Sequence, residues 1–247
     1  MKNLKSIEQF INEELSQNIS QVTKTVGEYK KYTDKIDLTL LSPSTTIKAV
    51  EDLCQIAVDE KVYSVCVPID FVGYAKGYLE NSDVRICTVI DFPKGESKTS
   101  ERLKKTKEAI QKGVDEIDIV FNYKRFLKDD DNAEEYLLND LRDINSECVK
   151  NSVILKVIIE TGLLTYEQII LICSIIKKCG IIYIKTSTGM ISDDDSFNDK
   201  IKKVEIIRRN IPDYMKIKIS GGIRTLDQLK QAYSVADRIG TSTIPKN

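Results

Sequence analysis

The 247-residue chain contains no histidine. This absence excludes Ser-His-Asp and Cys-His catalysis, histidine-ligated zinc and acid–base chemistry by imidazole. Any catalysis must therefore use lysine, aspartate, glutamate, cysteine, tyrosine or backbone groups. No two of the 6 cysteines form a CxxC motif, so neither a zinc cluster nor a thioredoxin-type redox pair is expected. Most cysteines fall in apolar runs, which predicts reduced, packed thiols in a cytoplasmic protein.

The chain also lacks an excess of either charge and any long apolar run. Lys+Arg number 37 and Asp+Glu number 38, which gives a net charge of -1. Binding to a nucleic-acid backbone requires a basic excess, so nucleic acid is not an expected partner. No apolar stretch approaches the roughly 20 residues of a membrane span, and no apolar segment follows the first residues. We therefore expect no membrane segment and no signal peptide.

Short β-branched runs recur from residue 35 onward, and each is followed by a longer charged stretch of helical period. The predicted strands are 35–41, 64–69, 85–91, 116–122, 154–160, 183–189, 216–222 and 237–243. The predicted helices between them are 44–60, 70–80, 98–112, 133–150, 165–178, 197–210 and 225–235. This alternation predicts an α/β protein with a parallel sheet, and eight such units are typical of a (β/α)8 TIM barrel. The competing architecture is an open doubly wound sheet, but the first strand–helix turn at 41–44 contains no glycine.

The pattern predicts a single TIM-barrel domain over 1–247, with an N-terminal helical extension at 1–34 and the barrel at 35–243. Apolar residues from Leu4 to Val26 recur at helical spacing and predict an amphipathic helix or a pair of helices. Only four residues follow Thr243, so the eighth helix is expected to be truncated or absent. We hypothesise that segment 4–26 or a partner subunit covers the outer face of the last strand.

Strand alternation places many polar side chains inside the barrel. The outer face of a parallel barrel packs against helices and must be apolar, so the intervening residues face inward. Buried charges without partners cost several kcal/mol, so these groups must pair or serve a function. The alternative is an exposed rim, where charge costs little. The inward set comprises Asp37, Thr39, Asp118, Asn122, Lys156, Glu160, Lys185, Ser187, Lys216, Lys218 and Ser220.

Two inward lysines, Lys185 and Lys218, fall on adjacent predicted strands, which lie only about 4.8 Å apart. A neutral lysine amine attacks a carbonyl group to form a Schiff base. A neighbouring ammonium group and desolvation can lower a lysine pKa from roughly 10.4 to about 7–8. The pattern therefore predicts a nucleophilic lysine beside a second lysine that lowers its pKa. Asp118 on the fourth strand is placed to move protons.

Glycines and hydroxyls gather after the last three predicted strands. Ser220-Gly221-Gly222 follows the seventh strand, 240–243 ends the eighth, and 185–189 adds further hydroxyls and a glycine. Many barrels bind phosphate at these places through backbone N–H groups, and glycine lets the backbone approach the anion. Each short motif alone is a common turn signal, but together they predict a phosphate site. Arg224 is equally consistent with a phosphate contact and with a surface salt bridge.

These segments resemble those of the deoxyribose-phosphate aldolases, a family of class I aldolases on a (β/α)8 barrel. The likeness runs in order from about residue 35 to 243. The matching segments are Asp37–Thr39, Asp91–Gly95, Glu116–Val120, Leu155–Gly162, Ile184–Gly189 and Lys218–Arg224.

The resemblance implies reversible cleavage of 2-deoxy-D-ribose 5-phosphate to D-glyceraldehyde 3-phosphate and acetaldehyde, in deoxyribonucleotide catabolism. It implies Lys185 as the Schiff-base nucleophile, Lys218 as the pKa-lowering group and Asp118 as the proton relay. Asp37 and Lys156 are implied as a supporting network. It implies neither a metal nor an organic cofactor, and as partners a sugar phosphate, an aldehyde and a second copy in a homodimer. The implied phosphate-binding residues are Gly189, Ser220, Gly221, Gly222, Gly240, Ser242 and Thr243.

Two other functions stay open on the sequence alone. One is a different Schiff-base aldolase that acts on a ketose phosphate. The other is a barrel that kept the motifs but lost turnover, because the chain lacks the C-terminal tail whose tyrosine aids proton transfer in some members of the family. The triplets Asp129–Asp131 and Asp193–Asp195 each precede a predicted helix and are expected to cap it, not to bind metal.

Overall fold

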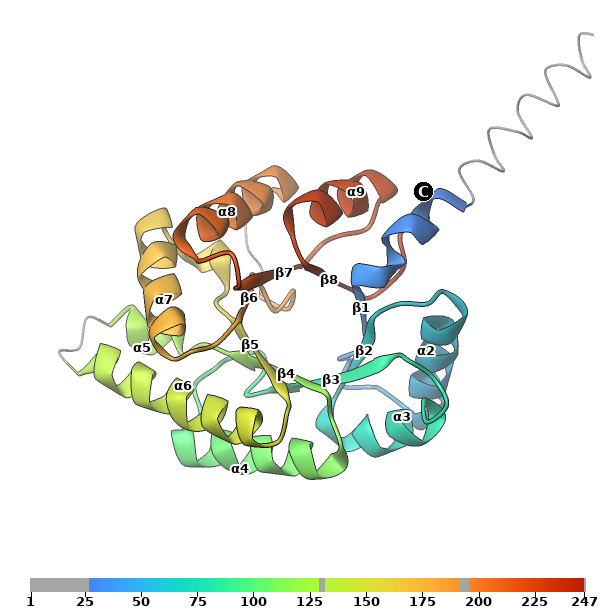
Figure 1. The fold of residues 1–247 in the computed structure, drawn as a ribbon, viewed down its shortest axis with the longest axis horizontal. Coiled ribbons are helices and arrows are strands. Elements are labelled where there is room, and N and C mark those ends of the chain that lie inside the picture. The colour runs from blue at the N-terminus through green and yellow to red at the C-terminus, as the bar shows by residue number, and fades with distance from the viewer. Residues whose placement is uncertain (1–26, 129–131, 192–195, 247) are drawn as a thin grey trace, which may run out of the picture.

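The computed structural model describes residues 27–128, 132–191 and 196–246. Within these ranges eight parallel strands close into one barrel, each pairing with its neighbours in chain order (Figure 1). The predicted TIM barrel is confirmed, and β8 pairs with β1, which excludes an open sheet. The strands are β1 (Ile36–Thr39), β2 (Ser64–Val67), β3 (Arg85–Ile90), β4 (Glu116–Val120), β5 (Ile154–Ile158), β6 (Tyr183–Lys185), β7 (Lys216–Ser220) and β8 (Arg238–Thr241).

Helices surround the barrel and cover its outer face (Figure 1). The crossover helices lie close to their predicted positions: α2 (Ile47–Asp59), α3 (Val72–Tyr78), α4 (Thr99–Lys112), α6 (Ala133–Lys150), α7 (Tyr166–Lys178), α8 (Phe197–Asn210) and α9 (Leu226–Val235). Two shorter helices overlap predicted ones: η1 (Tyr29–Lys35) lies at the end of the predicted helical extension, and η2 (Ile69–Phe71) at the start of the helix predicted at 70–80. Two others were not predicted: α5 (Tyr123–Phe126) and η3 (Thr161–Leu163). None of the helices in the described ranges is long and apolar enough to cross a membrane.

Local sequence signals fix where two of the long helices begin. Thr165 caps α7 by accepting a hydrogen bond from the backbone N–H of Gln168, whose side chain accepts one from the Thr165 N–H. Thr225 and Gln228 repeat this capping box at α9. Each box satisfies backbone donors that the first helical turn leaves without partners. The two helices therefore start directly after the loops that follow β5 and β7.

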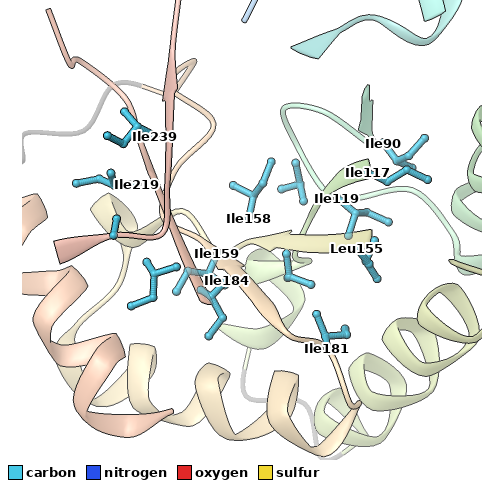
Figure 2. Close-up of a cluster of buried hydrophobic side chains, with 14 of the residues drawn as sticks. Ile90, Ile117, Ile119, Leu155, Ile158, Ile159, Ile181, Ile184, Ile219 and Ile239 are labelled. Carbon is cyan, nitrogen blue, oxygen red and sulfur yellow. The ribbon is translucent and has the colours of Figure 1, made fainter. Parts of the chain in front are cut away.

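Isoleucine is the commonest residue in the buried apolar cluster of the described chain. Ile117, Ile119, Ile184, Ile219 and Ile239 are fully buried, and Figure 2 shows them along successive strands. Branched side chains suit the pleated surface of a strand, and their burial against helices is the main source of stability. The residues that alternate with them face the barrel interior, as the sequence pattern predicts.

Three side-chain predictions need correction. Lys216 is not inside the barrel: it is the first residue of β7 and is exposed at the amino-terminal edge. Ile182 has the same alternation phase as Ile184, which predicts packing on the outer face, but it is 40 % exposed because it precedes β6. Asn122 leaves the barrel interior to cap α5, where its side chain accepts a hydrogen bond from the Arg125 N–H. All three lie where a strand begins or has ended, so strict alternation no longer applies.

The short helix η1 covers the outer side of β8, in the gap between α9 and α2 (Figure 1). The Lys35 ammonium group donates to the Tyr233 carbonyl oxygen at 2.9 Å, beside the end of α9. At the other end of η1, the Tyr29 hydroxyl donates to the Glu60 carboxylate at the end of α2, at 2.9 Å. Residues 242–246 form no helix, and η1 packs at this side of β8. The hypothesis for segment 4–26 lies outside the described residues.

Candidate active site

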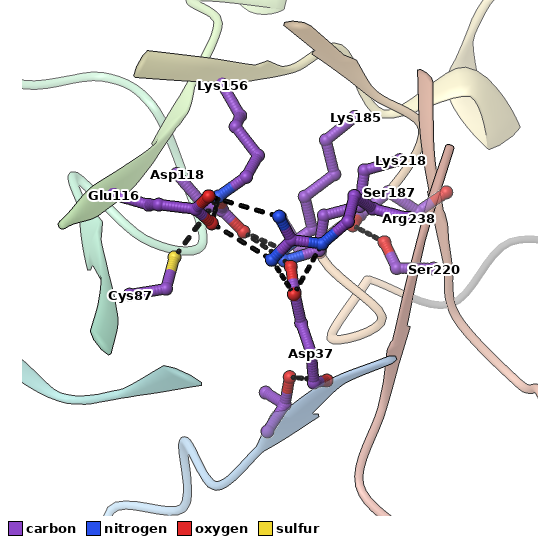
Figure 3. Close-up of polar contacts among 12 residues, drawn as sticks. Asp37, Cys87, Glu116, Asp118, Lys156, Lys185, Ser187, Lys218, Ser220 and Arg238 are labelled. Carbon is purple, nitrogen blue, oxygen red and sulfur yellow. Dashed lines mark hydrogen bonds and ion pairs between the residues drawn. The ribbon is translucent and has the colours of Figure 1, made fainter. Parts of the chain in front are cut away.

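Seven charged side chains meet inside the barrel, contributed by six of its strands (Figure 3). All seven are buried, which excludes the alternative of an exposed rim. They are Asp37 of β1, Glu116 and Asp118 of β4, Lys156 of β5, Lys185 of β6, Lys218 of β7 and Arg238 of β8.

Asp118 is the hub of this cluster. Its Oδ1 atom accepts a hydrogen bond from the Lys156 Nζ at 2.9 Å. Its Oδ2 atom accepts from the Lys185 Nζ at 2.9 Å and from the Lys218 Nζ at 2.7 Å. Burial raises the pKa of Asp118, but the three ammonium groups outweigh burial and hold that pKa well below its usual range. Asp118 is therefore an ionised carboxylate at neutral pH.

Lys218 is held as a cation between two carboxylates. Its Nζ atom lies 2.5 Å from Asp37 Oδ2 as well as 2.7 Å from Asp118 Oδ2. Burial lowers the pKa of Lys218, but the charges of Asp118 and Asp37 outweigh it and raise the pKa above its usual value. Lys185 is the register partner of Lys218 on the next strand, and both ammonium groups contact the same oxygen of Asp118. The predicted lysine pair is thus present at contact distance from one carboxylate.

Arg238 links Asp37 of β1 to Glu116 of β4. Its guanidinium group donates to Glu116 Oε1 and Oε2, both at 3.0 Å, and to Asp37 Oδ1. The Arg238 Cζ atom lies 3.4 Å from the centroid of the Tyr63 ring. Glu116 Oε2 also lies 2.6 Å from the Lys156 Nζ. The ion pairs therefore form a continuous ring beneath Lys185.

Sequence reasoning assigned no role to Arg238 or Glu116. The signal was present, because Arg238 has the same alternation phase as Gly240 on β8, and Glu116 the same phase as Asp118 on β4. Burial raises the pKa of Asp37, but the charges of Lys218 and Arg238 outweigh it and hold that pKa far below its usual value. Arg238 and Glu116 thus belong to the network predicted for Asp37 and Lys156.

A cavity of about 400 Å³ opens above the cluster, at the carboxyl-terminal ends of β6, β7 and β8. Of the seven clustered side chains, only Lys185 lines it. Arg224 also lines it, and no carboxylate does so among the residues that the structure describes. Thr243 does not line the cavity; its N–H group donates to Thr241 Oγ1 at 3.4 Å. The other predicted phosphate-binding residues all line it: Gly189, Ser220, Gly221, Gly222, Gly240 and Ser242.

Two kinds of glycine shape this cavity. Gly221 and Gly222 have φ angles of 95° and 76°, in the left-handed region that side chains disfavour. Consecutive N–H groups in such turns form concave sites for anions. Gly240 serves a different purpose, because a Cβ atom there would lie 3.1 Å from Lys218 Cε and 3.0 Å from Ser220 Cβ. Glycine at 240 therefore leaves room for the Lys218 side chain.

Hydrogen bonds hold the loop after β6 against β7. The Ser220 hydroxyl donates to the Ser187 carbonyl oxygen at 2.5 Å, and the Ser220 N–H donates to Thr186 Oγ1 at 3.1 Å. The buried Glu160 carboxylate accepts from the Thr188 N–H at 3.1 Å. The hydroxyls and glycines around Lys185 thus have defined positions before a ligand binds.

One group of side chains has metal-ligand character. Ligand atoms of Cys66, Cys87 and Asp118 lie within 4.8 Å of one another. The Lys156 Nζ already lies 3.5 Å from Cys87 Sγ and 2.9 Å from Asp118 Oδ1. Burial raises the pKa of Cys87 well above its usual value, which keeps this thiol protonated. These residues do not fit a metal site, because a cation there would displace Lys156; the two aspartate triplets lie outside the described residues.

A protein-family model matches the part of the chain that forms the barrel. The model of the DeoC/LacD family aldolases matches residues 31–243. The deoxyribose-phosphate aldolase of Metamycoplasma arthritidis (strain 158L3-1) is 42% identical over 214 residues, which cover 86% of this chain and 94% of the relative.

Solved structures agree with this family and with the barrel. An aldolase named QR15 superimposes with a TM-score of 0.78 at 32% identity, covering 86% of this chain and 92% of that chain. The deoxyribose phosphate aldolase of Aeropyrum pernix, described as a tetramer, superimposes with a TM-score of 0.77 at 25% identity. That match covers 91% of this chain and 92% of that chain.

Proposed function

Because the chain belongs to the DeoC/LacD family of aldolases, we propose that it cleaves 2-deoxy-D-ribose 5-phosphate through a Schiff base on Lys185. The products are D-glyceraldehyde 3-phosphate and acetaldehyde, and the reaction is reversible. The predicted enzyme class, a carbon–carbon lyase on a TIM barrel, is confirmed by the family. The observation that carries the site assignment is the position of Lys185, which contacts Asp118 on one side and the cavity on the other.

Lys185 makes fewer ion pairs than the other basic groups of the cluster. The buried cluster contains four basic groups and three carboxylates. A net charge inside a dry protein interior is costly, and loss of one proton brings the sum to zero. Lys156, Lys218 and Arg238 each contact two carboxylates, whereas Lys185 contacts Asp118 alone among the described residues. Lys185 is therefore the basic group of the cluster with the fewest ion pairs to break when its amine attacks a carbonyl carbon.

The proposed cleavage begins when the neutral Lys185 Nζ attacks the aldehyde carbon C1 of the open-chain sugar. Water leaves the resulting carbinolamine, and a protonated imine remains. A base removes the proton from the C3 hydroxyl, the C2–C3 bond breaks, and its electron pair moves into the imine to give an enamine. Protonation at C2 and hydrolysis release acetaldehyde and restore the lysine amine.

Asp118 is the proposed proton carrier in these steps. Its Oδ2 atom lies 2.9 Å from the Lys185 Nζ, within the range of a direct proton transfer. Burial lowers the pKa of Lys218, but Asp118 and Asp37 raise it further, so Lys218 stays charged beside Lys185. We propose Asp37 and Lys156 as the groups that hold Lys218 and Asp118 in place.

The glycine-rich end of the cavity is the proposed site for the 5-phosphate. Gly189, Gly221 and Gly222 all adopt positive φ angles, and all line the cavity with Lys185. Their N–H groups suit a phosphate dianion, and Ser242 adds a hydroxyl donor. Ser220 lines the same cavity, but its hydroxyl donates to the Ser187 carbonyl oxygen. Thr243 is not part of this proposal, because it lies outside the cavity.

A cytoplasmic location and a homodimer are further proposals. The location is supported by six free thiols, which are typical of a reducing compartment. The homodimer follows from the family resemblance alone. Light scattering on the purified protein measures its mass directly, and a monomer or a tetramer would contradict the dimer.

A cleavage assay on purified protein tests the proposed function. We expect acetaldehyde release from 2-deoxy-D-ribose 5-phosphate, a loss of about 10⁴-fold or more in kcat for Lys185→Ala, and near-normal turnover for the exposed control Lys216→Ala. Preferential cleavage of a ketose phosphate would instead support the alternative aldolase. A folded protein that cleaves neither substrate would contradict the proposal.

A further inference from the structure

We propose that Lys200 of α8 is a specificity-determining residue: its buried ammonium group selects a phosphorylated over an unphosphorylated substrate. This inference rests on the proposed function and extends it to a residue outside the cavity wall. The relevant contact joins α8 to the turn after β7.

Lys200 reaches the phosphate end of the cavity from behind the glycines. The side chain is only 8 % exposed, and its Nζ atom lies 3.5 Å from the Gly221 carbonyl oxygen. A Cβ atom on Gly221 would lie 3.3 Å from this Nζ and 3.7 Å from the Gly189 Cα. Lys200, Gly221 and Gly189 therefore converge at one place, where the backbone of two proposed phosphate-binding loops meets a buried cation.

Burial makes this charge effective. An ammonium group in a low-dielectric surrounding acts more strongly on a nearby anion than a solvated one, because water and salt screen it less. Among the described residues, two charged groups line the cavity: Lys185, which is the proposed nucleophile, and Arg224, which is exposed. Lys200 is a buried cation in contact with the glycine turn, so its charge lies beside the proposed phosphate site.

Lys203 provides a matched control on the same helix. It lies one turn further along α8, is 7 % exposed, and its Nζ donates to the Thr161 carbonyl oxygen at 2.8 Å. This hydrogen bond joins Lys203 to the end of the loop after β5, at the first residue of η3. Replacement of either lysine removes a buried charge from the inner face of α8, but only Lys200 touches the glycine turn.

The test compares Lys200→Met and Lys203→Met on two substrates, 2-deoxy-D-ribose 5-phosphate and 2-deoxy-D-ribose. We expect Lys200→Met to raise KM for the phosphorylated substrate about tenfold and to weaken inhibition by inorganic phosphate by a similar factor. Its kcat, and its kcat/KM for the unphosphorylated sugar, should stay within about twofold of wild type. Lys203→Met should leave the ratio of the two kcat/KM values unchanged, and Lys200→Arg should restore most of the preference.

Three results would overturn the inference. They are an equal loss on both substrates in Lys200→Met, the same change of ratio in Lys203→Met, or unaltered phosphate inhibition. If Lys200→Met does not fold, as judged by thermal melting, Lys200→Gln replaces it in the same comparison. Trapping of acetaldehyde on Lys185 with borohydride separates the two proposals, because acetaldehyde has no phosphate. A wild-type protein without an adduct refutes the proposed function, whereas an adduct with unchanged phosphate preference refutes only the role of Lys200.

Discussion

The two ends of the barrel interior differ in chemistry. The lower end, which we call the floor cluster, consists of Asp37, Glu116, Lys156 and Arg238, all buried and joined by ion pairs. The upper end, which we call the glycine rim, consists of Gly189, Ser220–Gly222, Gly240 and Ser242 around an open cavity. The floor cluster is charged and does not line the cavity. The glycine rim lines the cavity, and its residues carry no charged side chain.

Lys185 lies at the boundary between these regions, with Asp118 and Lys218 beside it. Ion pairs below set the protonation of the groups around it, while the cavity above admits the substrate. A buried ion pair contributes little net stability compared with an apolar pair, so the floor cluster is better explained by the charge state it imposes. The comparison teaches that reactivity is set on one side of Lys185 and substrate binding on the other.

The largest expected effect follows from the hub between the two regions. Asp118→Asn should lower kcat by about 10²–10⁴-fold, because a neutral amide neither accepts the Lys185 proton nor balances three cations. Steady-state kinetics on the cleavage reaction provide the measurement. A variant that folds normally and keeps kcat within about tenfold of wild type would remove Asp118 from the mechanism.

Breaking the floor cluster should mainly reduce stability. Arg238→Met leaves Asp37 and Glu116 without their shared cation, and we expect a loss of about 3–5 kcal/mol in the free energy of unfolding. The control is Arg208→Met, which removes a half-exposed pair with Asp237 and should cost no more than about 1 kcal/mol. Denaturant titration measures both values, and equal losses would contradict a special role for the floor cluster.

The loss of stability at low pH should depend on the carboxylates of the same buried charges, Asp37 and Asp118. The pKa values of Asp37 and Asp118 are held below their unfolded values of about 3.9, so their stabilisation is present above that pH. It is lost as the pH falls below about 4 towards the folded pKa values. The pKa values of Lys156 and Lys218 are raised, so their stabilisation persists at least up to pH of about 10.

Melting temperatures measured across this range should therefore show a plateau and a decline below about pH 4. The decline should be smaller in Asp118→Asn, which has lost one of the two carboxylates. A decline that begins near pH 6 would assign the acid sensitivity to other groups.

We expect the smallest effect from a substitution in the glycine rim. Ser242→Ala should raise KM for the phosphorylated substrate by about three- to tenfold, because a single hydroxyl contact contributes about 0.5–1.5 kcal/mol. Its kcat and its stability should match those of wild type. Thr243→Val is the neighbouring control, since Thr243 does not line the cavity. Equal KM changes in the two variants would argue against a phosphate site at this rim.

Much of the fold could be predicted because its signals are local. Recurring β-branched runs located the eight strands. Alternation along those strands placed Lys185, Lys218 and Asp118 inside, and the structure brings these three together. The same rule failed for Lys216 and Asn122, which lie where strands begin or end. Thr243 likewise follows the last residue of β8, where the chain has already turned away from the cavity.

The remaining features depend on contacts between distant segments. The cover of β8 by η1 arises from contacts of Lys35 with Tyr233 and of Tyr29 with Glu60, which no local pattern specifies. The approach of Lys200 to Gly221 likewise requires α8 and the turn after β7 to be placed side by side. Arg238 is different. Alternation along β8 already indicates that its side chain faces inward, and only its ion-pair partners could not be predicted from the sequence.

Reductive trapping tests the central claim most directly. Acetaldehyde and borohydride are added to the folded protein, and the modified peptide is identified by mass spectrometry. Because only Lys185 joins the buried cluster to the cavity, we expect one ethyl group on Lys185 and none on Lys218 or Lys156. An adduct on Lys218, or none on Lys185 in a protein that melts cooperatively, would contradict the assignment of reactivity to the boundary between the two regions.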